Sequence, residues 1–129
     1  MTRGDQPTRW FRVQPIGYVR RPDAPEPDPE AFYDPWAETA LEILPRWEDA
    51  LAGIEEYSHL FVIVWLDGVS APRLLRRAGR TLWVSGIDAW PGTPILDIKG
   101  YAPRDDLRQD ATVPNWLETL WSAHDAERG

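Results

Sequence analysis

Proline and glycine divide this chain into short segments. The 129 residues include thirteen prolines and nine glycines, and both residue types end helices and interrupt strands. The longest apolar run, Leu60–Leu66 (LFVIVWL), has the length of one buried strand and falls well short of the ~20 residues that cross a bilayer. We therefore expect one domain over residues 1–129, made of many short strands with little long helix.

Hydrophobic alternation between these breaks predicts a mainly β fold. A short helical turn is expected at Trp47–Tyr57 and a C-terminal helix at Asn115–Ala123, because their apolar residues recur at helical spacing. The proline-rich Arg21–Pro29 is expected to be an extended surface loop, and residues 1–9 and 124–129 to be flexible. Strands are expected at Trp10–Arg20 (broken at Pro15), Thr39–Leu44, Leu60–Leu66, Ile95–Lys99 and in a hairpin, Leu74–Gly86, that turns at Ala78–Gly79. Short strands with such turns are typical of a small β-barrel, here with a short C-terminal helix attached.

Composition and missing motifs exclude several classes of protein. The chain has no cysteine, which excludes a disulfide scaffold, a thiolate zinc site and a cysteine nucleophile. Its two histidines lie far apart, so no metal site is expected, and no P-loop, GxGxxG or GxSxG string occurs. The net charge of −7 excludes a general nucleic-acid coat protein. No apolar leader precedes Trp10, so we expect a cytoplasmic protein without a membrane anchor.

Two strings carry the candidate chemistry. Ser58 and His59 stand side by side at the start of the apolar strand, where a polar side chain needs partners. In the second string, Gly86–Tyr101, Asp97 and Lys99 share one strand face, and Asp88 precedes a Pro-Gly-Thr-Pro turn whose backbone amides could hold an anion or a ribose hydroxyl. Purely structural roles are the alternative for both strings, as a turn cap in the first and a surface ion pair in the second.

One segment is basic. It has four arginines within eight residues and no acidic residue, so it could contact phosphates, although a solvated hairpin surface is the alternative. These residues are Arg73, Arg76, Arg77 and Arg80.

Taken together, the strings resemble the TsaA-like (TrmO) family, whose members include S-adenosylmethionine-dependent methyltransferases that modify threonylcarbamoyladenosine beside the tRNA anticodon. The resemblance spans roughly residues 11 to 106. The matching segments are PIGYVR at 15–20, LAGIEEYSHL at 51–60 with the following strand, and GIDAWPGTPILDIKGY at 86–101. The last segment is the most specific.

The resemblance implies a small β-barrel, a homodimer, S-adenosylmethionine bound near the subunit interface, and methyl transfer to the exocyclic nitrogen of a modified adenosine in tRNA. For that reaction His59 and Asp97 are the candidate catalytic groups, and Lys99 or the four arginines could meet tRNA phosphates. The implied cofactor-binding residues are Ser58, Asp88, Gly92, Thr93, Pro94 and Tyr101.

The sequence departs from the family at the place that matters most for the cofactor. Family members carry an RSP…RPNPIGL segment after the Ser-His strand, whereas here Leu66 reaches Leu74 through only DGVSAPR. Pro91 stands where the family usually has Asp, and Gly100 where it has Pro. Either the segment is truly deleted or a loop is left out of the sequence as written; consecutive Cα atoms about 3.8 Å apart would indicate the former. A non-catalytic barrel that binds a ligand or dimerises is therefore the alternative function.

Overall fold

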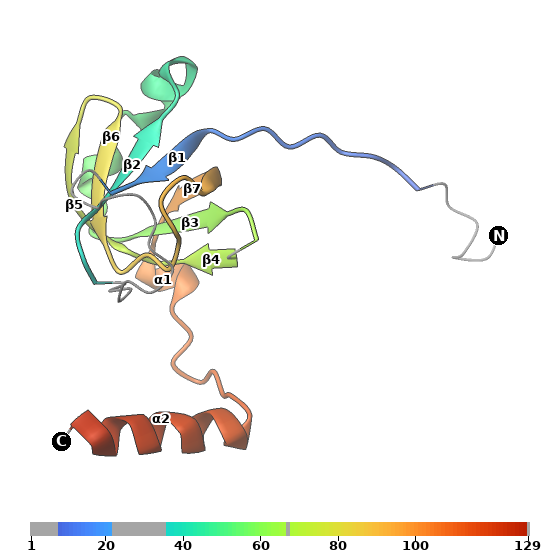
Figure 1. Cartoon of the computed structure of the whole chain (residues 1–129), viewed down its shortest axis with the longest axis vertical. Coiled ribbons are helices and arrows are strands. Elements are labelled where there is room, and N and C mark those ends of the chain that lie inside the picture. The colour runs from blue at the N-terminus through green and yellow to red at the C-terminus, as the bar shows by residue number, and fades with distance from the viewer. Residues whose placement is uncertain (1–7, 22–35, 67, 129) are drawn as a thin grey trace.

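The computed structural model describes residues 8–21, 36–66 and 68–128. Its seven strands are β1 (Gly17–Arg20), β2 (Thr39–Ile43), β3 (Leu60–Val64), β4 (Gly68–Ser70), β5 (Arg73–Ala78), β6 (Thr81–Ser85) and β7 (Pro94–Gly100). The helical elements are the 3₁₀ helices η2 (Pro45–Leu51) and η3 (Ile54–Glu56), and the α-helices α1 (Pro103–Asp106) and α2 (Asn115–Arg128). The mainly β class is confirmed (Figure 1). Within these ranges no helix is both long and apolar enough to cross a membrane.

All seven strands belong to one antiparallel sheet in the order β4-β3-β7-β1-β2-β6-β5. This order is open, so the closed barrel is not confirmed. The two outermost strands, β4 and β5, are nevertheless consecutive and separated only by Ala71–Pro72. A bridge between His59 and Arg73 joins the start of β5 to the start of β3, with hydrogen bonds from Leu60 N to Pro72 O (3.0 Å) and Leu74 N to Ser58 O (2.8 Å).

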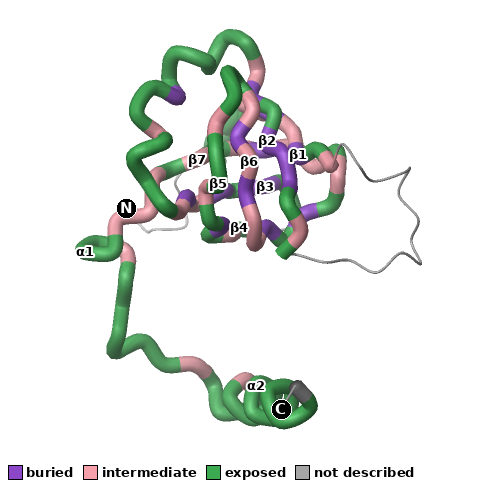
Figure 2. Tube along the Cα trace, turned by 90° about the vertical axis from the view of Figure 1, so that its left-hand side faces the viewer, coloured by how far each residue is buried: buried purple, intermediate pink, exposed green. Residues whose placement is uncertain are grey.

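The core lies on one face of the sheet because the strands alternate. In β3, Leu60, Val62 and Val64 are buried, while Phe61 and Ile63 point to the opposite face. The same alternation buries Leu82 and Val84 of β6. Figure 2 shows the buried positions gathered along the inner strands, and the whole of α2 lying outside the core. The opposite face of β3 and β7 therefore lies outside the core.

Most expected elements are present with shifted ends. The strands at Thr39–Leu44, Leu60–Leu66 and Ile95–Lys99 and the hairpin turning at Gly79 (φ 60°) are confirmed, and the helical turn appears as two 3₁₀ helices separated at Gly53 (φ 84°). The strand expected at Trp10–Arg20 begins only at Gly17. Residues 22–29 of the proline-rich segment lie outside the described residues. Helix α2 continues to Arg128, and β4 and α1 are additional elements.

The short connection after β3 forms a tight hairpin. Val64 pairs with Gly68 and Val62 with Ser70, so only three residues separate β3 from β4. Leu66 in this turn has a left-handed backbone (φ 71°), and its side chain is exposed. The described residues on either side of position 67 are thus in regular antiparallel register.

Candidate functional site

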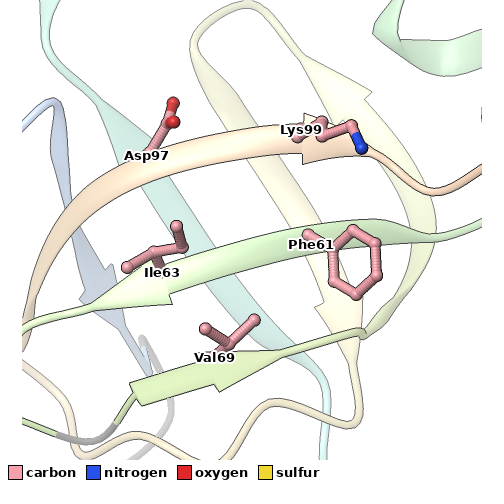
Figure 3. A pocket seen from close by; sticks show the side chains of 5 residues that line it. All are labelled: Phe61, Ile63, Val69, Asp97 and Lys99. Carbon is pink, nitrogen blue, oxygen red and sulfur yellow. The ribbon is translucent and has the colours of Figure 1, made fainter. Parts of the chain in front are cut away.

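Three neighbouring strands place alternate side chains on one outer face of the sheet. We call it the outer face: His59, Phe61 and Ile63 of the β3 region, Val69, Ala71 and Arg73 of the β4–β5 region, and Asp97, Lys99 and Tyr101 of the β7 region. Register brings them together, because Phe61 pairs with Lys99, and Ile63 with both Asp97 and Val69. Figure 3 shows five of them around a pocket of about 200 Å³, lined by Phe61, Ile63, Val69, Asp97 and Lys99.

A second pocket of about 280 Å³ continues along the same face. It is lined by His59, Ala71 and Tyr101. The Tyr101 ring packs against Phe61 of the first pocket, with ring centres 5.1 Å apart, and edge-on against His59 at 6.2 Å. The aromatic rings therefore form a row that joins the two pockets, and such rings offer flat apolar surface on which a base can stack.

The Ser58–His59 pair is anchored on both sides. Leu74 N donates to Ser58 O (2.8 Å) and Tyr101 N donates to His59 O (2.9 Å), so the neighbouring strands fix the backbone of the pair. The Ser58 hydroxyl lies 2.8 Å from Nδ1 of His59. This contact occupies Nδ1, because one of the two groups donates to the other in either neutral tautomer. Nε2 is then the ring nitrogen available to a ligand.

Lys99 is held over the aromatic row by helix α1. Its Nζ lies 3.2 Å from Oδ1 of Asp106 and 5.7 Å from the centre of the Phe61 ring. The pKa of Asp106 is lowered, first by the hydrogen bond from the Ala102 backbone N–H and further by Lys99. Asp106 therefore stays ionised at neutral pH and holds the ammonium of Lys99 at this end of the outer face.

Asp97 stands between two cavities. Its Oδ1 accepts a hydrogen bond from Ile98 N (2.9 Å), and within the described part of the chain Oδ2 has no hydrogen-bond partner. Besides the pocket in Figure 3, Asp97 borders an apolar cavity of about 280 Å³ between the sheet and η2–η3. The other residues of that cavity are Ile16, Ile43, Trp47, Ala50, Leu51, Ile54 and Ile98. A carboxylate with a free oxygen beside apolar walls can attract a cation or accept a proton.

The turn before β7 is built differently from the expectation. Gly92 N donates to Val19 O (2.7 Å) and Thr93 N to Trp90 O (3.1 Å), so both amides are already engaged and are not free to hold an anion. Asp88 lies nearby, with its own N–H bonded to the hydroxyl of Ser70 (3.3 Å). Pro94 and Tyr101 bound β7 at its two ends, roughly 20 Å apart for an extended strand of this length. The expected cofactor-binding residues thus fall into two separate groups.

Three of the four clustered arginines have structural partners. Arg76 pairs with Glu38 and lies over the Trp83 ring at 4.6 Å. Arg77 pairs with Glu55 and donates to the carbonyls of Leu51 (3.1 Å) and Gly79 (2.8 Å), and Arg80 donates to Ile43 O (2.6 Å). Arg73 is opposite His59 on the outer face and has no ion pair among the described residues.

The structure thus places His59, Asp97, Lys99, Tyr101 and Arg73 on one face of the sheet, whereas the other three arginines are engaged with structural partners. Sequence reasoning missed Phe61, Ile63, Val69 and Asp106. The first two could have been found, since alternation from His59 places them on the same face. Val69 and Asp106 belong to β4 and α1, which had not been foreseen. Among the described residues no cluster of three or more potential metal ligands occurs.

Comparison with known proteins identifies relatives. The family model of the tRNA-methyltransferase O N-terminal domain matches residues 67–107. A "Probable S-adenosyl-L-methionine-binding protein" of Methanothermobacter thermautotrophicus is 30% identical over 123 residues, covering 70% of this chain and 90% of the relative. A protein of the same name from Archaeoglobus fulgidus is 36% identical over 110 residues, covering 60% of this chain but 30% of the relative.

Solved structures agree with these matches. The crystal structure of TrmO from Pseudomonas aeruginosa superposes with a TM-score of 0.68 at 29% identity, covering 85% of this chain and 63% of that chain. The present chain therefore spans less than two thirds of the TrmO chain and under a third of the Archaeoglobus relative. Shared sequence, shared fold and nearly full coverage of the Methanothermobacter protein lead to one conclusion: this chain belongs to the TrmO (TsaA-like) family.

Proposed function

We propose that this protein is a cytoplasmic S-adenosylmethionine-dependent methyltransferase that acts on threonylcarbamoyladenosine in tRNA. One observation carries the proposal: the outer face gathers an aromatic row, one carboxylate and two cations around adjoining pockets. Membership of the TrmO family and the names of the relatives support the same reaction.

The residues of the outer face fit the chemistry of S-adenosylmethionine. Phe61 and Tyr101 offer rings for its adenine. The free oxygen of Asp97 complements the positive sulfonium or ammonium. When bound, S-adenosylmethionine supplies an electrophilic methyl group. Each of the two pockets alone is smaller than the ~300–1,000 Å³ typical of ligand sites, so a ligand of this size would occupy both.

The chain's own residues would orient the acceptor and receive its proton. The exocyclic nitrogen of the modified adenosine is a poor nucleophile, so a proton acceptor is needed nearby. Nε2 of His59 and Oδ2 of Asp97 are the two available atoms on the outer face. Lys99 and Arg73 would meet tRNA phosphates, a local attraction that has to overcome the net charge of −7. Phe61, Ile63 and Val69 would exclude water from the reacting groups.

A calorimetric titration and a thermal shift with S-adenosylmethionine test the proposal first. At a ligand concentration of 100 times the dissociation constant, binding stabilises the fold by about 2.7 kcal/mol. Tyr101→Ala and Thr93→Ala then ask which end of β7 holds the cofactor; we expect Tyr101→Ala to weaken binding more. In a methylation assay on tRNA that carries threonylcarbamoyladenosine, His59→Ala and Asp97→Ala should lower turnover with the fold retained. Normal turnover in both variants would remove their assigned roles.

The alternative is a non-catalytic member that binds a ligand or dimerises. The observation that favours it is the tight β3–β4 hairpin, in which Val64 pairs with Gly68 at the place where family members carry a longer segment. This alternative predicts full stability without S-adenosylmethionine. An intact mass of 14.8 kDa together with no binding at millimolar ligand would establish it in place of the enzyme.

A further inference from the structure

The segment that precedes β1 leaves the sheet at a proline. The N–H of Ile16 still donates to β7 (2.8 Å), but Pro15 has no N–H, so the pairing ends there. We call Arg9–Gln14 the N-terminal arm. Figure 1 shows it, in blue, running away from the sheet. At its base the arm is attached to η2, because Arg46 donates to the side-chain oxygen of Gln14 (3.0 Å).

The N-terminal arm exposes aromatic rings and cations together. Trp10 and Phe11 are 92% and 85% exposed. Arg9 and Arg12 flank these rings, and within the described ranges neither arginine forms a hydrogen bond or an ion pair. Arg20 of β1, by contrast, is held by a carboxylate 3.2 Å away. The arm therefore offers positive charge to an external anion in a chain whose net charge is −7.

Alternation along the arm mixes the two kinds of side chain. Successive side chains of an extended segment point to opposite sides, so Arg9 and Phe11 share one side. Trp10 and Arg12 share the other. Neither side is wholly apolar, which a strand that covers a core or an anchor that enters a bilayer surface would need. A ring beside a guanidinium suits unpaired nucleic acid instead, since bases stack on rings while arginine contacts the phosphates.

The same combination continues at the base of the arm. The guanidinium of Arg46 lies 5.7 Å from the centre of the Trp47 ring, which is 43% exposed. Arg46 has no carboxylate partner in the part of the chain that the structure describes. Glu48 and Asp49 follow directly in η2 and would repel phosphates. The surface that suits an RNA therefore ends at Trp47 and runs outward along the arm.

We propose that the N-terminal arm binds an unpaired loop of the RNA substrate, with Trp10 and Phe11 stacking on bases and Arg9 and Arg12 contacting phosphates. The inference rests on the proposed action on tRNA and adds an RNA contact apart from the outer face. It also explains how so acidic a chain attracts RNA, because these arginines are not neutralised by carboxylates.

A salt titration of RNA binding tests the phosphate contacts. The probe is an unmodified anticodon stem-loop RNA, and affinity is measured at several salt concentrations without S-adenosylmethionine. Each phosphate contact adds roughly 0.7–0.9 to the slope of log affinity against log salt, so Arg9→Ala/Arg12→Ala should lower that slope by about 1.4–1.8. Arg20→Ala is the matched control and should keep the wild-type slope, because Arg20 already has a carboxylate partner. An unchanged slope in the double variant would overturn the proposal.

Substitution of Trp10 tests the stacking. Trp10→Ala should weaken binding of the same RNA by about five- to a hundredfold, and Trp10→Phe should restore most of the affinity. Trp116→Ala, at an exposed position of α2, is the control that should bind as the wild type does. Undiminished binding by Trp10→Ala would overturn the proposal. Equal affinity for polyglutamate or for phosphatidylglycerol vesicles, lost in the same variants, would assign the arm to a protein or a membrane and overturn it as well.

Binding of S-adenosylmethionine separates this inference from the proposed enzyme. We expect every arm variant to bind the cofactor as the wild type does, because the arm contributes no residue to the two pockets of the outer face. A chain that binds RNA through the arm but binds no S-adenosylmethionine would overturn the methyltransferase and support the arm. A chain that binds both, with no loss of RNA affinity in the arm variants, would overturn the arm and leave the enzyme intact.

Discussion

The hydroxyl of Ser58 and Nδ1 of His59 lie 2.8 Å apart, which makes Ser58 a positioning residue for the imidazole. Hydrogen bonds from Leu74 and Tyr101 hold the backbone of the pair. The ring lines the pocket beside Tyr101 and Ala71, and Nε2 is the ring nitrogen without a hydrogen-bond partner among the described residues.

Removing the hydroxyl should release the ring without unfolding the protein. We expect Ser58→Ala to change the tautomer balance of His59 in ¹⁵N NMR spectra, whereas Ser58→Thr preserves it. His124, on exposed α2, is an internal reference whose signals should not move. Loss of one such hydrogen bond is worth roughly 0.5–1.5 kcal/mol, so the proposed methyl transfer should fall about two- to twelvefold. Identical His59 spectra in the wild type and Ser58→Ala would contradict the positioning role.

The arginines should separate into structural and surface residues. Arg77→Ala removes hydrogen bonds to the carbonyls of Leu51 and Gly79 and the pairing with Glu55, so urea denaturation should show a loss of about 1–3 kcal/mol. Arg73→Ala should leave the unfolding midpoint nearly unchanged and weaken RNA binding. The assignment fails if Arg73→Ala destabilises the fold as much as Arg77→Ala.

Replacing Leu66 with a residue that tolerates a left-handed backbone should stabilise the β3–β4 turn. This exposed residue has φ 71°, a conformation that costs a leucine about 1 kcal/mol and an asparagine much less. Leu66→Asn should therefore raise the unfolding free energy by a similar amount. Leu75→Asn, at an exposed position within β5, is the control that should give no gain.

The ionisation of Asp106 should make the free energy of unfolding depend on pH in the acidic range. Its folded-state pKa is lowered below the ordinary 3.8 by the Ala102 N–H and by Lys99, so it stabilises the fold fully above 3.8 and loses that effect as the pH falls through the lowered folded-state pKa. At neutral pH the wild type should be more stable than Asp106→Asn. We expect the unfolding midpoints of the two proteins, measured by urea denaturation at a series of pH values, to converge in acid. A difference that stays constant with pH would show that the ionisation of Asp106 does not contribute.

The sequence predicts elements that carry their own signals and misses those fixed from a distance. Alternation in Leu60–Val64 and the Ala78–Gly79 turn are local, and the structure confirms both. Strand β4 has three residues, too few for alternation to register, and it exists because Val69 pairs with Ile63. The strand expected from Trp10 starts at Gly17, because pairing with β2 and β7 begins there.

In the candidate site, too, the sequence predicts what local patterns determine and misses what depends on distant contacts. The strand period places Asp97 and Lys99 on one face, but nothing in the local sequence reveals which arginines meet a distant carbonyl. Arg80 reaches Ile43 and Arg77 reaches Leu51, both contacts that require the folded sheet. The sequence likewise predicts that the backbone amides of Gly92 and Thr93 are free to bind an anion. In the structure they donate to the carbonyls of Val19 and Trp90, and these contacts form only when the chain folds.

Consecutive strands at the two ends of the sheet also bear on aggregation. Unpaired strand edges invite other chains to add to a sheet, and natural proteins counter this with short edges and positive charge. Here one edge, β4, has only three residues, and the other, β5, carries Arg73, Arg76 and Arg77. The short β4 and the charged side chains along β5 therefore disfavour strand-to-strand joining between copies.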